Sequence, residues 1–448
     1  MKDNHREIRR VTLSDVLSAR ERRAGLQAKL LQEYKKPVLS FTMNIAGPVK
    51  NTSLIERAFE YGLRRIRGRI PSESVICDLI TKDFCGCEAM MTVDLDPEVL
   101  KKICVNIEEE SYLGRLFDMD VIDSCGKKLD RKVERACIVC GKEGRECSAG
   151  RLHSVDEIVS ATNKIMTDHF AKSDPERIGR LAAECLIKEV ETTPKPGLVD
   201  LRNNGSHTDM DVSTFRKSAN ALIPYFTECV KIGIDSQNLD VESTFDRLRA
   251  AGLIADATMY ETTGGVNTHK GAIYSMGVLL GAIGRLWSAE LPIADRKEIL
   301  AQASKLVKES VDSDLNLANG STAGERLYLE RGLKGIRGEV ASGFFSVLEY
   351  ALPVYESEMK KGASQNDSGV RTLLSLIFSI DDTNLYHRGG EEGVRFAKER
   401  AKDLLFYGYN LADVEKMDDD FIERRLSPGG SADLLAVTYL LFDLENYK

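Results

Sequence analysis

The sequence lacks the features of several large protein classes. Its 448 residues include only 11 prolines and 35 glycines, with no repeat or low-complexity segment, which excludes a collagen-like chain. A hydrophobic share of 42% is enough to bury cores, so disorder as the main state is excluded as well. The longest apolar stretch, 273–286, is too short to span a membrane and is interrupted by glycine.

Positive charge is not in excess either. The 62 Lys and Arg residues face 70 Asp and Glu residues, which gives a formal net charge of −8. Nonspecific binders of nucleic acid or of anionic membranes need basic patches that neutralise phosphates, so we expect neither kind of partner. A small phosphorylated ligand remains compatible with this charge. The amino terminus, MKDNHREIRR, has no apolar signal-peptide segment, and we expect a cytoplasmic protein.

Composition changes along the chain and predicts two domains. Eight of the 10 cysteines lie between Cys77 and Cys147. We predict an α+β domain over 1–160, with strands within 37–45, 89–95 and 115–122, and an all-α domain over 170–448. The intervening segment, 156–174, is expected to be helical and to end before Pro175. Helical periodicity then covers 176–190, 214–232, 272–287, 296–311, 339–352, 369–380, 391–406 and 431–445.

Five polar, glycine-rich segments separate the predicted helices of the second domain. Taken singly, each is explained as well by an ordinary loop between helices as by a binding site; together they indicate a site. Gly264 and Gly265, followed by His269 and Lys270 before an apolar helix, fit a phosphate cradle with cationic residues, although the Walker A spacing is absent. The segments also carry carboxylates that can bind Mg²⁺ or act as acid and base: Asp200, Asp209, Asp211, Glu325, Glu339, Asp381, Asp382 and Asp433.

A family resemblance goes further. The motifs TTPKPGLVDLRNNGSHTDMD, TTGGVNTHKGAIYSMG, GERLYLERGLKGIRGEVASGF, DDTNLYHRGG and SPGGSADLLA, within about 175–445, resemble triphosphoribosyl-dephospho-CoA synthases, with Glu261 as a minor departure. The resemblance implies a reaction of ATP with 3′-dephospho-CoA that forms 2′-(5″-triphosphoribosyl)-3′-dephospho-CoA and releases adenine. It also implies an oxocarbenium-like transition state that a carboxylate stabilises.

The same resemblance guides the assignment of residues in the second domain. We assign acid–base or metal roles to Asp200, Asp209, Asp211 and Asp382, with Asp200 as a Mg²⁺ ligand. Substrate binding is assigned to Lys195, Asn203, His207, Gly264, Gly265, Asn267, His269, Lys270, Arg326 and Arg388. Among these, Lys195, His269, Lys270 and Arg388 are expected to offset the triphosphate charge.

In the first domain, Asp118 and Asp120 stand two residues apart in a predicted strand. Their side chains therefore share one face, as in nucleotidyltransferases that hold metal ions on a nucleoside triphosphate. A solvated strand end explains the same pair equally simply. The context VLSFTMNIAGPVKNTSLIERAF, GRLFDMDVID and ACIVCGKEGRECSAGRLHS, within about 10–160, resembles holo-citrate lyase synthases.

That second resemblance implies a nucleotidyltransferase-like domain. It would transfer phosphoribosyl-dephospho-CoA to a serine of the citrate lyase acyl carrier protein, the gamma subunit, with pyrophosphate as leaving group. Asp118 and Asp120 would hold Mg²⁺, and Lys50 and Arg115 would lie near the phosphates. Asn44 would shape the ligand loop or simply stand in a turn. A related malonate decarboxylase pathway uses the same prosthetic group, so the acceptor follows from resemblance alone.

Cys137, Cys140, Cys147 and His153 form a C-x₂-C-x₆-C-x₅-H array. The array has the donor types and spacing of a small structural zinc site. Reduced, metal-free thiols are the alternative, with Arg151 and His153 contacting phosphates.

The two resemblances together predict a bifunctional transferase. Two alternatives stay open: one half is degenerate, or the chain is a nucleotide-binding scaffold or sensor of the lyase complex without turnover.

Overall fold

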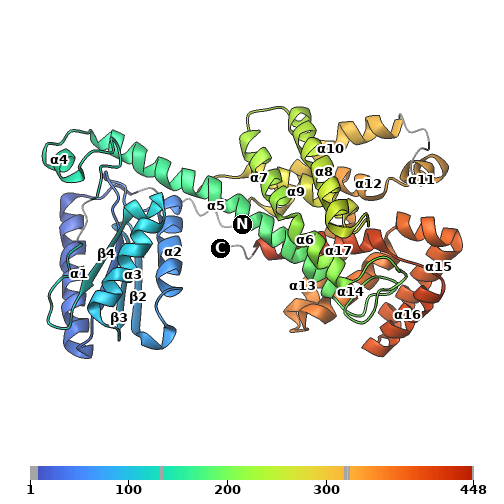
Figure 1. The fold of residues 1–448 in the computed structure, drawn as a ribbon, viewed down its shortest axis with the longest axis horizontal. Coiled ribbons are helices and arrows are strands. Elements are labelled where there is room, and N and C mark those ends of the chain that lie inside the picture. Colours follow the sequence, from blue (N-terminus) through green and yellow to red (C-terminus); the bar gives the residue numbers. More distant parts are fainter. Residues whose placement is uncertain (1–8, 132–134, 317–319, 321–322, 446–448) are drawn as a thin grey trace. The chain divides into compact units, whose positions relative to one another are not determined.

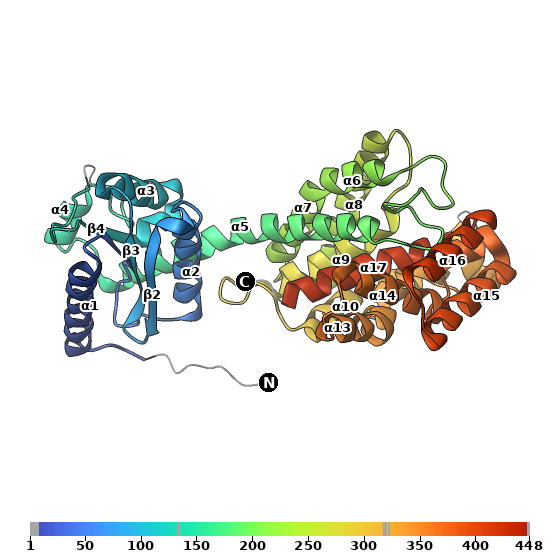
Figure 2. The same ribbon diagram turned by 90° about the horizontal axis from the view of Figure 1, so that it is seen from below.

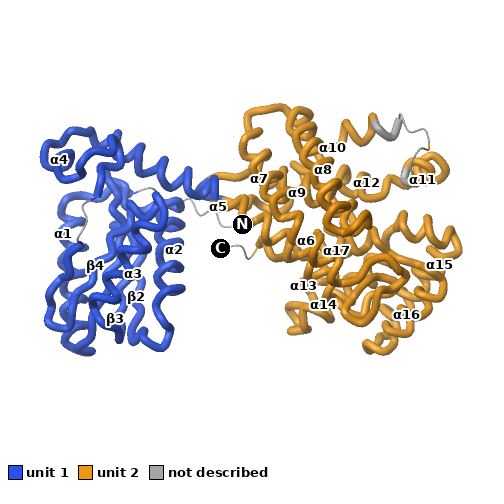
Figure 3. The backbone as a smooth tube through the Cα atoms, viewed as in Figure 1, with its two compact units in different colours: residues 1–172, 289–291 blue, residues 173–288, 292–448 orange. Residues whose placement is uncertain are grey.

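A computed structural model describes residues 9–131, 135–316, 320 and 323–445. The chain divides into two compact units, shown in Figure 3: residues 1–172 with 289–291, and residues 173–288 with 292–448. Residues 1–10 show no signal-peptide pattern. Residues 1–8 of this stretch lie outside the described part of the chain. No helix of the described chain combines the length and apolar character needed to cross a bilayer.

Unit 1 is built on a four-stranded antiparallel sheet in the order β2-β3-β1-β4. Its elements are α1 (Leu13–Tyr34), β1 (Val38–Met43), α2 (Ser53–Arg67), η1 (Ser72–Ser74), β2 (Val75–Asp83), β3 (Gly86–Val93), α3 (Pro97–Glu110), η2 (Tyr112–Leu116), β4 (Phe117–Ile122) and α4 (Gly144–Ala149). From β1 to β4 this is the β-α-β-β-α-β order of ferredoxin-like sheets. An N-terminal α+β unit is therefore confirmed, whereas its nucleotidyltransferase-like character stays a prediction.

The three predicted strands correspond to β1, β3 and β4, but β2 was not predicted. It is an edge strand whose large apolar residues Ile76, Leu79 and Ile80 remain 40–44% exposed. Such a strand shows no clear alternation between a buried and a solvated face, and so gives a weak signal.

The two faces of the sheet are covered by different helices (Figures 1 and 2). On one face, Phe41 of β1 stacks on Phe59 of α2 with ring centroids 4.8 Å apart. On the other, Leu30 of α1 packs against Val38 and Met90. Because successive strand residues point to opposite faces, the α1 face also carries the polar side chains of β4.

Helix α5 (Val155–Glu191) begins in unit 1 and ends in unit 2, and the predicted stop before Pro175 is wrong. Proline removes one backbone donor from a helix interior. The helix continues because the residues beyond it are buried, including Ile178, Ala182 and Leu186 in the core of unit 2. Packing of this apolar face outweighs the local preference for a break.

Unit 2 consists of helices and loops, with no strand among its described residues, which confirms its all-α prediction. Besides the end of α5, its elements are α6 (Val212–Ala221), α7 (Ile223–Asp235), α8 (Val241–Thr263), α9 (Lys270–Leu286), α10 (Arg296–Asn316), α11 (Ala323–Arg331), α12 (Gly335–Ala341), the π-helical η3 (Val347–Ala351), α13 (Leu352–Lys360), α14 (Gln365–Ser379), α15 (Thr383–Tyr407), α16 (Leu411–Glu423) and α17 (Gly429–Glu445). Helices α9 and α17 are the most deeply buried parts of this core.

The glycines of the apolar run in α9 permit a close helix crossing. A Cβ atom on Gly284 would lie 2.1 Å from the Val230 carbonyl oxygen of α7, and one on Gly233 would lie 2.2 Å from the Gly281 carbonyl oxygen. Neither contact is possible for a larger residue without separating α7 from α9. The glycine-interrupted run 273–286 is thus a core helix of unit 2.

Candidate functional site

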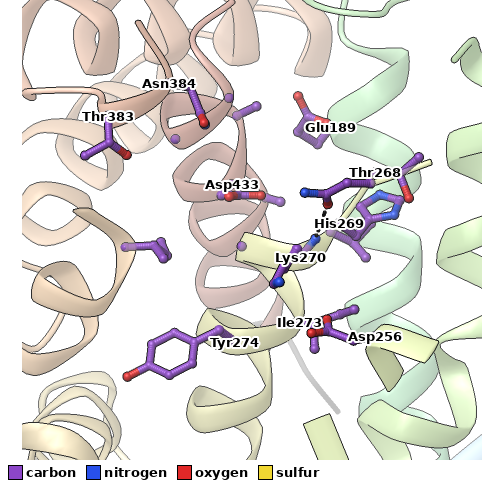
Figure 4. A pocket seen from close by; sticks show the side chains of 18 of the residues that line it. Glu189, Asp256, Thr268, His269, Lys270, Ile273, Tyr274, Thr383, Asn384 and Asp433 are labelled. Carbon is purple, nitrogen blue, oxygen red and sulfur yellow. Dashed lines mark hydrogen bonds between the residues drawn. The ribbon is translucent and has the colours of Figure 1, made fainter. Parts of the chain in front are cut away.

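Unit 2 encloses a cavity of about 930 Å³ between the end of α5, α8, the start of α9, α15 and α17. This volume is at the upper end of the roughly 300–1,000 Å³ typical of small-molecule sites. Figure 4 shows Asp433 in the middle of the site, with Glu189, His269 and Lys270 on neighbouring elements. The lining combines apolar side chains with carboxylates and cations, as a nucleotide site requires.

The start of α9 forms one wall of this cavity. His269 is its N-cap residue, and Asn267, Thr268, Lys270 and Gly271 also line the cavity. Free backbone amides at a helix start favour an anionic ligand. The predicted association of His269 and Lys270 with a helix start is therefore present in the structure.

His269 was expected to offset the triphosphate charge as a cation, but its surroundings favour the neutral imidazole. Burial, followed by the nearby Lys195 ammonium, lowers the pKa of His269 to about 3, so the imidazole is neutral at physiological pH. The Thr268 hydroxyl donates to Ser218 Oγ (2.8 Å), and Ser218 lies 2.8 Å from His269 Nδ1. We assign the Ser218 hydroxyl as the donor and His269 Nδ1 as the acceptor of this hydrogen bond. The proton of the neutral imidazole is then on Nε2. His269 Nε2 is buried and has no hydrogen-bond partner among the described residues.

Two carboxylates that the sequence analysis did not select as catalytic stand in the cavity wall. Glu189, at the end of α5, is 5% exposed and forms a buried ion pair with Lys195. Asp433, near the start of α17, has no hydrogen-bond or ion-pair partner in the described part of the chain. Desolvation, followed by repulsion from Glu189 and Asp382, raises the pKa of Asp433 well above its ordinary value.

The absence of a side chain at Gly271 lets the Asp433 carboxylate approach α9. A Cβ atom at Gly271 would lie 1.9 Å from Asp433 Oδ2. The carboxyl group therefore sits against the first turn of α9. Within the glycine-rich segment 262–271, this is the glycine on which the geometry of the site depends.

The remaining polar lining supplies one more carboxylate and several cations. Asp256 of α8 has a buried Oδ1 without a hydrogen-bond partner among the described residues, and burial raises its pKa while Lys270 opposes the shift. Cationic side chains enter from several different elements. They are Lys195, Arg249, Lys270, Arg337 and Arg388.

The structure brings together about half of the predicted substrate and catalytic residues of this unit. Lys195, His207, Asp209, Asn267, His269, Lys270 and Arg388 line the cavity. His207 Nε2 lies 3.0 Å from Ser427 Oγ, and Arg388 Nη2 lies 3.3 Å from His207 Nδ1. Burial, followed by the Arg388 charge, lowers the pKa of His207.

Other predicted residues lie outside the lining and have local partners. Gly264 has a φ of +70° and ends α8, with its N–H donating to the Tyr260 carbonyl; Gly265 donates to the same oxygen. Their positive φ angles explain the glycines without a phosphate cradle. Arg326 donates to the Gly320 carbonyl oxygen (3.0 Å), and the Asp211 side chain caps α6.

Asp200 organises a loop. Its Oδ2 accepts from the backbone N–H of Lys195 (2.7 Å), and its Oδ1 accepts from the N–H groups of Arg202 (2.7 Å) and Asn203 (3.1 Å). Both oxygens thus accept backbone hydrogen bonds, and the contact with the Lys195 N–H fixes the backbone that carries the Lys195 side chain. The predicted Mg²⁺ role of Asp200 stays a prediction.

The same loop is tied to α16 by a second carboxylate. Asp418 accepts from the backbone N–H of Gly197 (2.8 Å) and from the Nδ2 of Asn203 (2.7 Å). Arg202 Nη1 also contacts Asp418 Oδ2 at 2.6 Å. Asn203, predicted to bind substrate, therefore contributes to the loop structure that presents Lys195 and Asp209.

Asp382 is 2% exposed and caps α15. Its Oδ2 accepts from the backbone N–H (2.8 Å) and the hydroxyl (3.0 Å) of Ser431, and its Oδ1 accepts from the Asn384 N–H (2.9 Å). These contacts join α15 to α17. Asp382 therefore has a structural role, and its catalytic role stays a prediction.

Replacement of Asp382 by alanine is expected to destabilise unit 2 by roughly 2–4 kcal/mol, because it removes a helix cap and leaves buried Ser431 donors unpaired. Urea unfolding followed by tryptophan fluorescence measures this, since the single Trp, Trp287, lies in unit 2. The exposed neighbour Asp381 provides the control: D381A should change stability by less than about 0.5 kcal/mol. A stable, catalytically dead D382A protein would contradict the structural assignment.

In unit 1, the α1 face of the sheet carries the carboxylates of Glu88, Asp118 and Asp120 next to one another. Thr42 of β1 pairs with Glu88 of β3 on one side and with Asp118 of β4 on the other, so their side chains share a face. Asp120 pairs with Ser40 in the adjacent row. The predicted common face of Asp118 and Asp120 is therefore present.

Charged partners surround these carboxylates unequally. Arg23 of α1 binds Glu88 through Nε (3.1 Å) and Nη2 (2.7 Å), and Lys128 Nζ contacts Asp120 Oδ2 at 2.6 Å. Asp118 has no hydrogen-bond or ion-pair partner among the described residues. Desolvation, followed by repulsion from Asp120, raises the pKa of Asp118. A divalent cation would relieve this repulsion, and carboxylate oxygens suit Mg²⁺.

The other predicted residues of unit 1 are held by backbone contacts. Arg115 donates to the Ala136 carbonyl oxygen, and Lys50 Nζ donates to the Ile45 carbonyl oxygen. Burial, followed by the Arg20 charge, lowers the pKa of Lys50. Asn44 is exposed at the end of β1, where its N–H donates to the Leu116 carbonyl (2.7 Å). None of these contacts tests their predicted phosphate roles.

Glu189 and Asp256 were missed because they stand inside helices rather than in polar loops. Glu189 lies among buried apolar residues such as Leu186 and Val190, and Asp256 follows the buried Ala255. The signal that identifies them is a carboxylate on the apolar face of an amphipathic helix. Asp433 was among the candidate carboxylates, but its sequence context did not separate it from the other seven.

Comparisons with known proteins match the two units separately and together. A family model described as ATP:dephospho-CoA triphosphoribosyl transferase matches residues 175–448, and one described as apo-citrate lyase phosphoribosyl-dephospho-CoA transferase matches residues 11–169. Protein CitXG of Haemophilus influenzae is 35% identical, over 96% of this chain and 95% of that protein. Protein CitXG of Leuconostoc mesenteroides subsp. cremoris is 32% identical, over 96% and 97%. The 2-(5''-triphosphoribosyl)-3'-dephosphocoenzyme-A synthase of Klebsiella pneumoniae is 41% identical, over 59% of this chain and 90% of that protein.

Proposed function

The chain belongs to the CitXG family, in which the two matched transferase parts are fused, and from this premise we propose which residues perform each reaction. The predicted resemblance to both families is confirmed. The chain is a bifunctional transferase that makes the citrate lyase prosthetic group and attaches it to the apo-acyl carrier protein. ATP as the triphosphoribosyl donor and a cytoplasmic location are part of the proposal.

The observation that carries the proposal for unit 2 is the pair of carboxylates, Glu189 and Asp433, in a cavity lined by cations. Burial raises the pKa of both carboxyl groups, but to a different extent. At Glu189 the Lys195 ammonium opposes the shift, whereas Asp433 has no cationic partner among the described residues and its pKa is raised well above the ordinary value. We therefore assign the ionised form to Glu189 and the protonated form to Asp433. Two such carboxyl groups are the requirement for acid–base transfer of a glycosyl group.

Roles follow from these states. The 2′-hydroxyl of dephospho-CoA attacks C1′ of the ATP ribose while the C1′–N9 bond to adenine breaks. Glu189 accepts the hydroxyl proton and stabilises positive charge on the ribose, and protonated Asp433 donates its proton to the departing adenine. Proton transfer from Glu189 to Asp433, directly or through solvent, restores the starting states.

The triphosphate is retained in this reaction and needs a cationic surround. Lys270, Arg249, Arg337 and Arg388 line the cavity and would supply this positive charge. The Nε2–H of His269 supplies a neutral donor. Mg²⁺ would offset further triphosphate charge, and Asp256 is a proposed protein ligand in unit 2 besides Asp200.

For unit 1, the proposal places transfer to the carrier protein at the α1 face of the sheet. A carrier-protein serine attacks the phosphate next to the ribose, and pyrophosphate leaves. Asp118 and Asp120 would hold Mg²⁺, which would neutralise charge on the transferred phosphate. Lys128 keeps one Asp120 oxygen oriented, and the nucleotidyltransferase-like chemistry predicted for this unit rests on this face.

The direct test incubates the purified full chain with ATP, dephospho-CoA and Mg²⁺ and separates adenine from ADP by chromatography. Adenine should form only when dephospho-CoA is present. Addition of citrate lyase apo-acyl carrier protein should then release pyrophosphate and increase the mass of the carrier protein. ADP without adenine would indicate an ordinary ATPase or kinase, and nucleotide binding without turnover would support the scaffold alternative.

A further inference from the structure

A cluster of sulfur and nitrogen atoms lies between β4 and α5, outside the residues used by either proposed reaction. Cys137 and Cys140 stand in a turn, Cys147 lies on the short helix α4, and His153 follows that helix. Cys140 Sγ lies 3.4 Å from Cys147 Sγ and 3.3 Å from His153 Nε2. The four ligand atoms all lie within 4.8 Å of one another.

These separations match a tetrahedral metal site. Zinc–sulfur bonds of about 2.3 Å and zinc–nitrogen bonds of about 2.0 Å place the ligand atoms of a tetrahedron roughly 3.5–3.8 Å apart. The observed atoms therefore need only small movements to enclose one ion. Three thiolates and one imidazole form a soft donor set that favours Zn²⁺ over Mg²⁺ or Ca²⁺.

The turn that carries the first two cysteines has local contacts suited to this role. The Val139 N–H donates to Cys137 Sγ (3.4 Å), and the Gly141 N–H donates to the Cys137 carbonyl (2.9 Å). Gly141 has a φ of +76°, which turns the chain directly after Cys140. Hydrogen bonds to ligand atoms are a common second layer of metal sites.

The segment is joined to the rest of unit 1 by polar contacts, such as the ion pairs of Arg131 and Arg135 with Glu108, and has few apolar ones. Between residues 123 and 154, Cys147 is the one buried hydrophobic side chain among the described residues. Helix α4 has only six residues, and the isolated bridges of the segment join Ile122 to Lys128 and Ala136 to Glu143. A small region without an apolar core usually depends on a disulfide or a metal ion for its structure. A tetrahedral site with four protein ligands leaves no coordination position for a substrate, as is typical of structural metal sites.

We propose that Cys137, Cys140, Cys147 and His153 bind one structural Zn²⁺ ion that holds the segment between β4 and α5 in place. The segment is joined to the start of β4: Arg135 Nη1 donates to the Phe117 carbonyl (2.8 Å), and Arg115 donates to the Ala136 carbonyl. Phe117 directly precedes Asp118. The ion therefore stabilises the strand end that carries the proposed transferase carboxylates, without taking part in the chemistry. Zinc binding itself does not depend on the proposed function.

The test measures metal in the full chain produced in zinc-supplemented medium. Mass spectrometry of the metal content should give about one zinc per chain, and a thiol-specific mercurial should release it. Metal-free full chain with Co²⁺ should show a thiolate-to-cobalt charge-transfer band and intense tetrahedral d–d bands. The substitution C140S should lower zinc content at least about tenfold. The matched control is C125S, an exposed cysteine in the same segment but outside the cluster, which should keep its zinc.

Several results would overturn the proposal. They are wild-type protein with less than about 0.1 zinc per chain and no cobalt bands, zinc retained by C140S at the wild-type level, or iron as the bound metal. The Co²⁺ titration keeps the test decisive if C140S fails to fold. A structural role further predicts that zinc removal, with Mg²⁺ restored, increases proteolysis within 135–154 and leaves adenine release unchanged.

Discussion

Replacement of Asp433 by asparagine is expected to lower the rate of adenine release by about 10²–10⁴-fold, because the amide cannot protonate the departing base. Binding of ATP and dephospho-CoA should remain, since the Asp433 carboxylate makes no hydrogen bond or ion pair with the described residues and asparagine has nearly the same shape. The measurement is the initial rate of adenine formation at saturating substrates, with binding followed by calorimetry.

The pH dependence of adenine release provides a second test of the role of Asp433. Because the reaction uses protonated Asp433 and its pKa is raised, adenine release should decline as pH rises through that pKa, and D433N should lose this alkaline decline. The same carboxyl is destabilising once ionised, since a raised folded-state pKa means that stability is lost as pH rises. D433N should therefore unfold at an equal or higher temperature than the wild type above neutral pH.

Two matched variants separate catalysis from damage to the fold. D381N changes an exposed carboxylate outside the cavity and should keep the wild-type rate. G271A keeps the Asp433 side chain but adds a Cβ atom 1.9 Å from the position of its Oδ2, so the carboxyl group must move. Adenine release should therefore fall, while transfer to the carrier protein is retained. Wild-type adenine release by D433N would remove Asp433 from the mechanism.

Replacement of Asp118 by asparagine is expected to lower transfer to the carrier protein by at least about 10²-fold and to leave adenine release unchanged. The carboxylate proposed to hold Mg²⁺ is lost, whereas the two reactions are assigned to different units. The D118N protein should therefore accumulate triphosphoribosyl-dephospho-CoA. Pyrophosphate release and the mass of the carrier protein measure the second step, and adenine measures the first.

The control for this variant is D78N on β2 of the same sheet, whose carboxylate pairs with Arg67 of α2. It should transfer the prosthetic group at a rate within about twofold of the wild type. Equal loss in D78N and D118N would indicate general damage to unit 1. Transfer by D118N at the wild-type rate would refute the metal-binding role of the β4 face.

Sequence patterns alone determined the two-part organisation and the bifunctional activity. Ordered motifs and the change from mixed to helical periodicity are properties of short segments, and local pattern is sufficient to recognise them. The pair Asp118 and Asp120 belongs to this class, because strand periodicity by itself places both carboxylates on one face. The side chains of Thr12 and Asp96 cap α1 and α3, and such caps are local patterns of the same kind.

The tertiary structure alone decided which carboxylates of the helical unit face the cavity. Asp200, Asp382 and Asp433 all stand in polar, glycine-rich segments, yet two of them accept hydrogen bonds from nearby backbone amides and one does not. Glu189 reaches the same cavity from the end of α5, far away in the sequence. Burial and the distance between charges set protonation states, and both depend on how distant helices pack. The roles proposed for Glu189 and Asp433 therefore follow from packing that no local pattern contains.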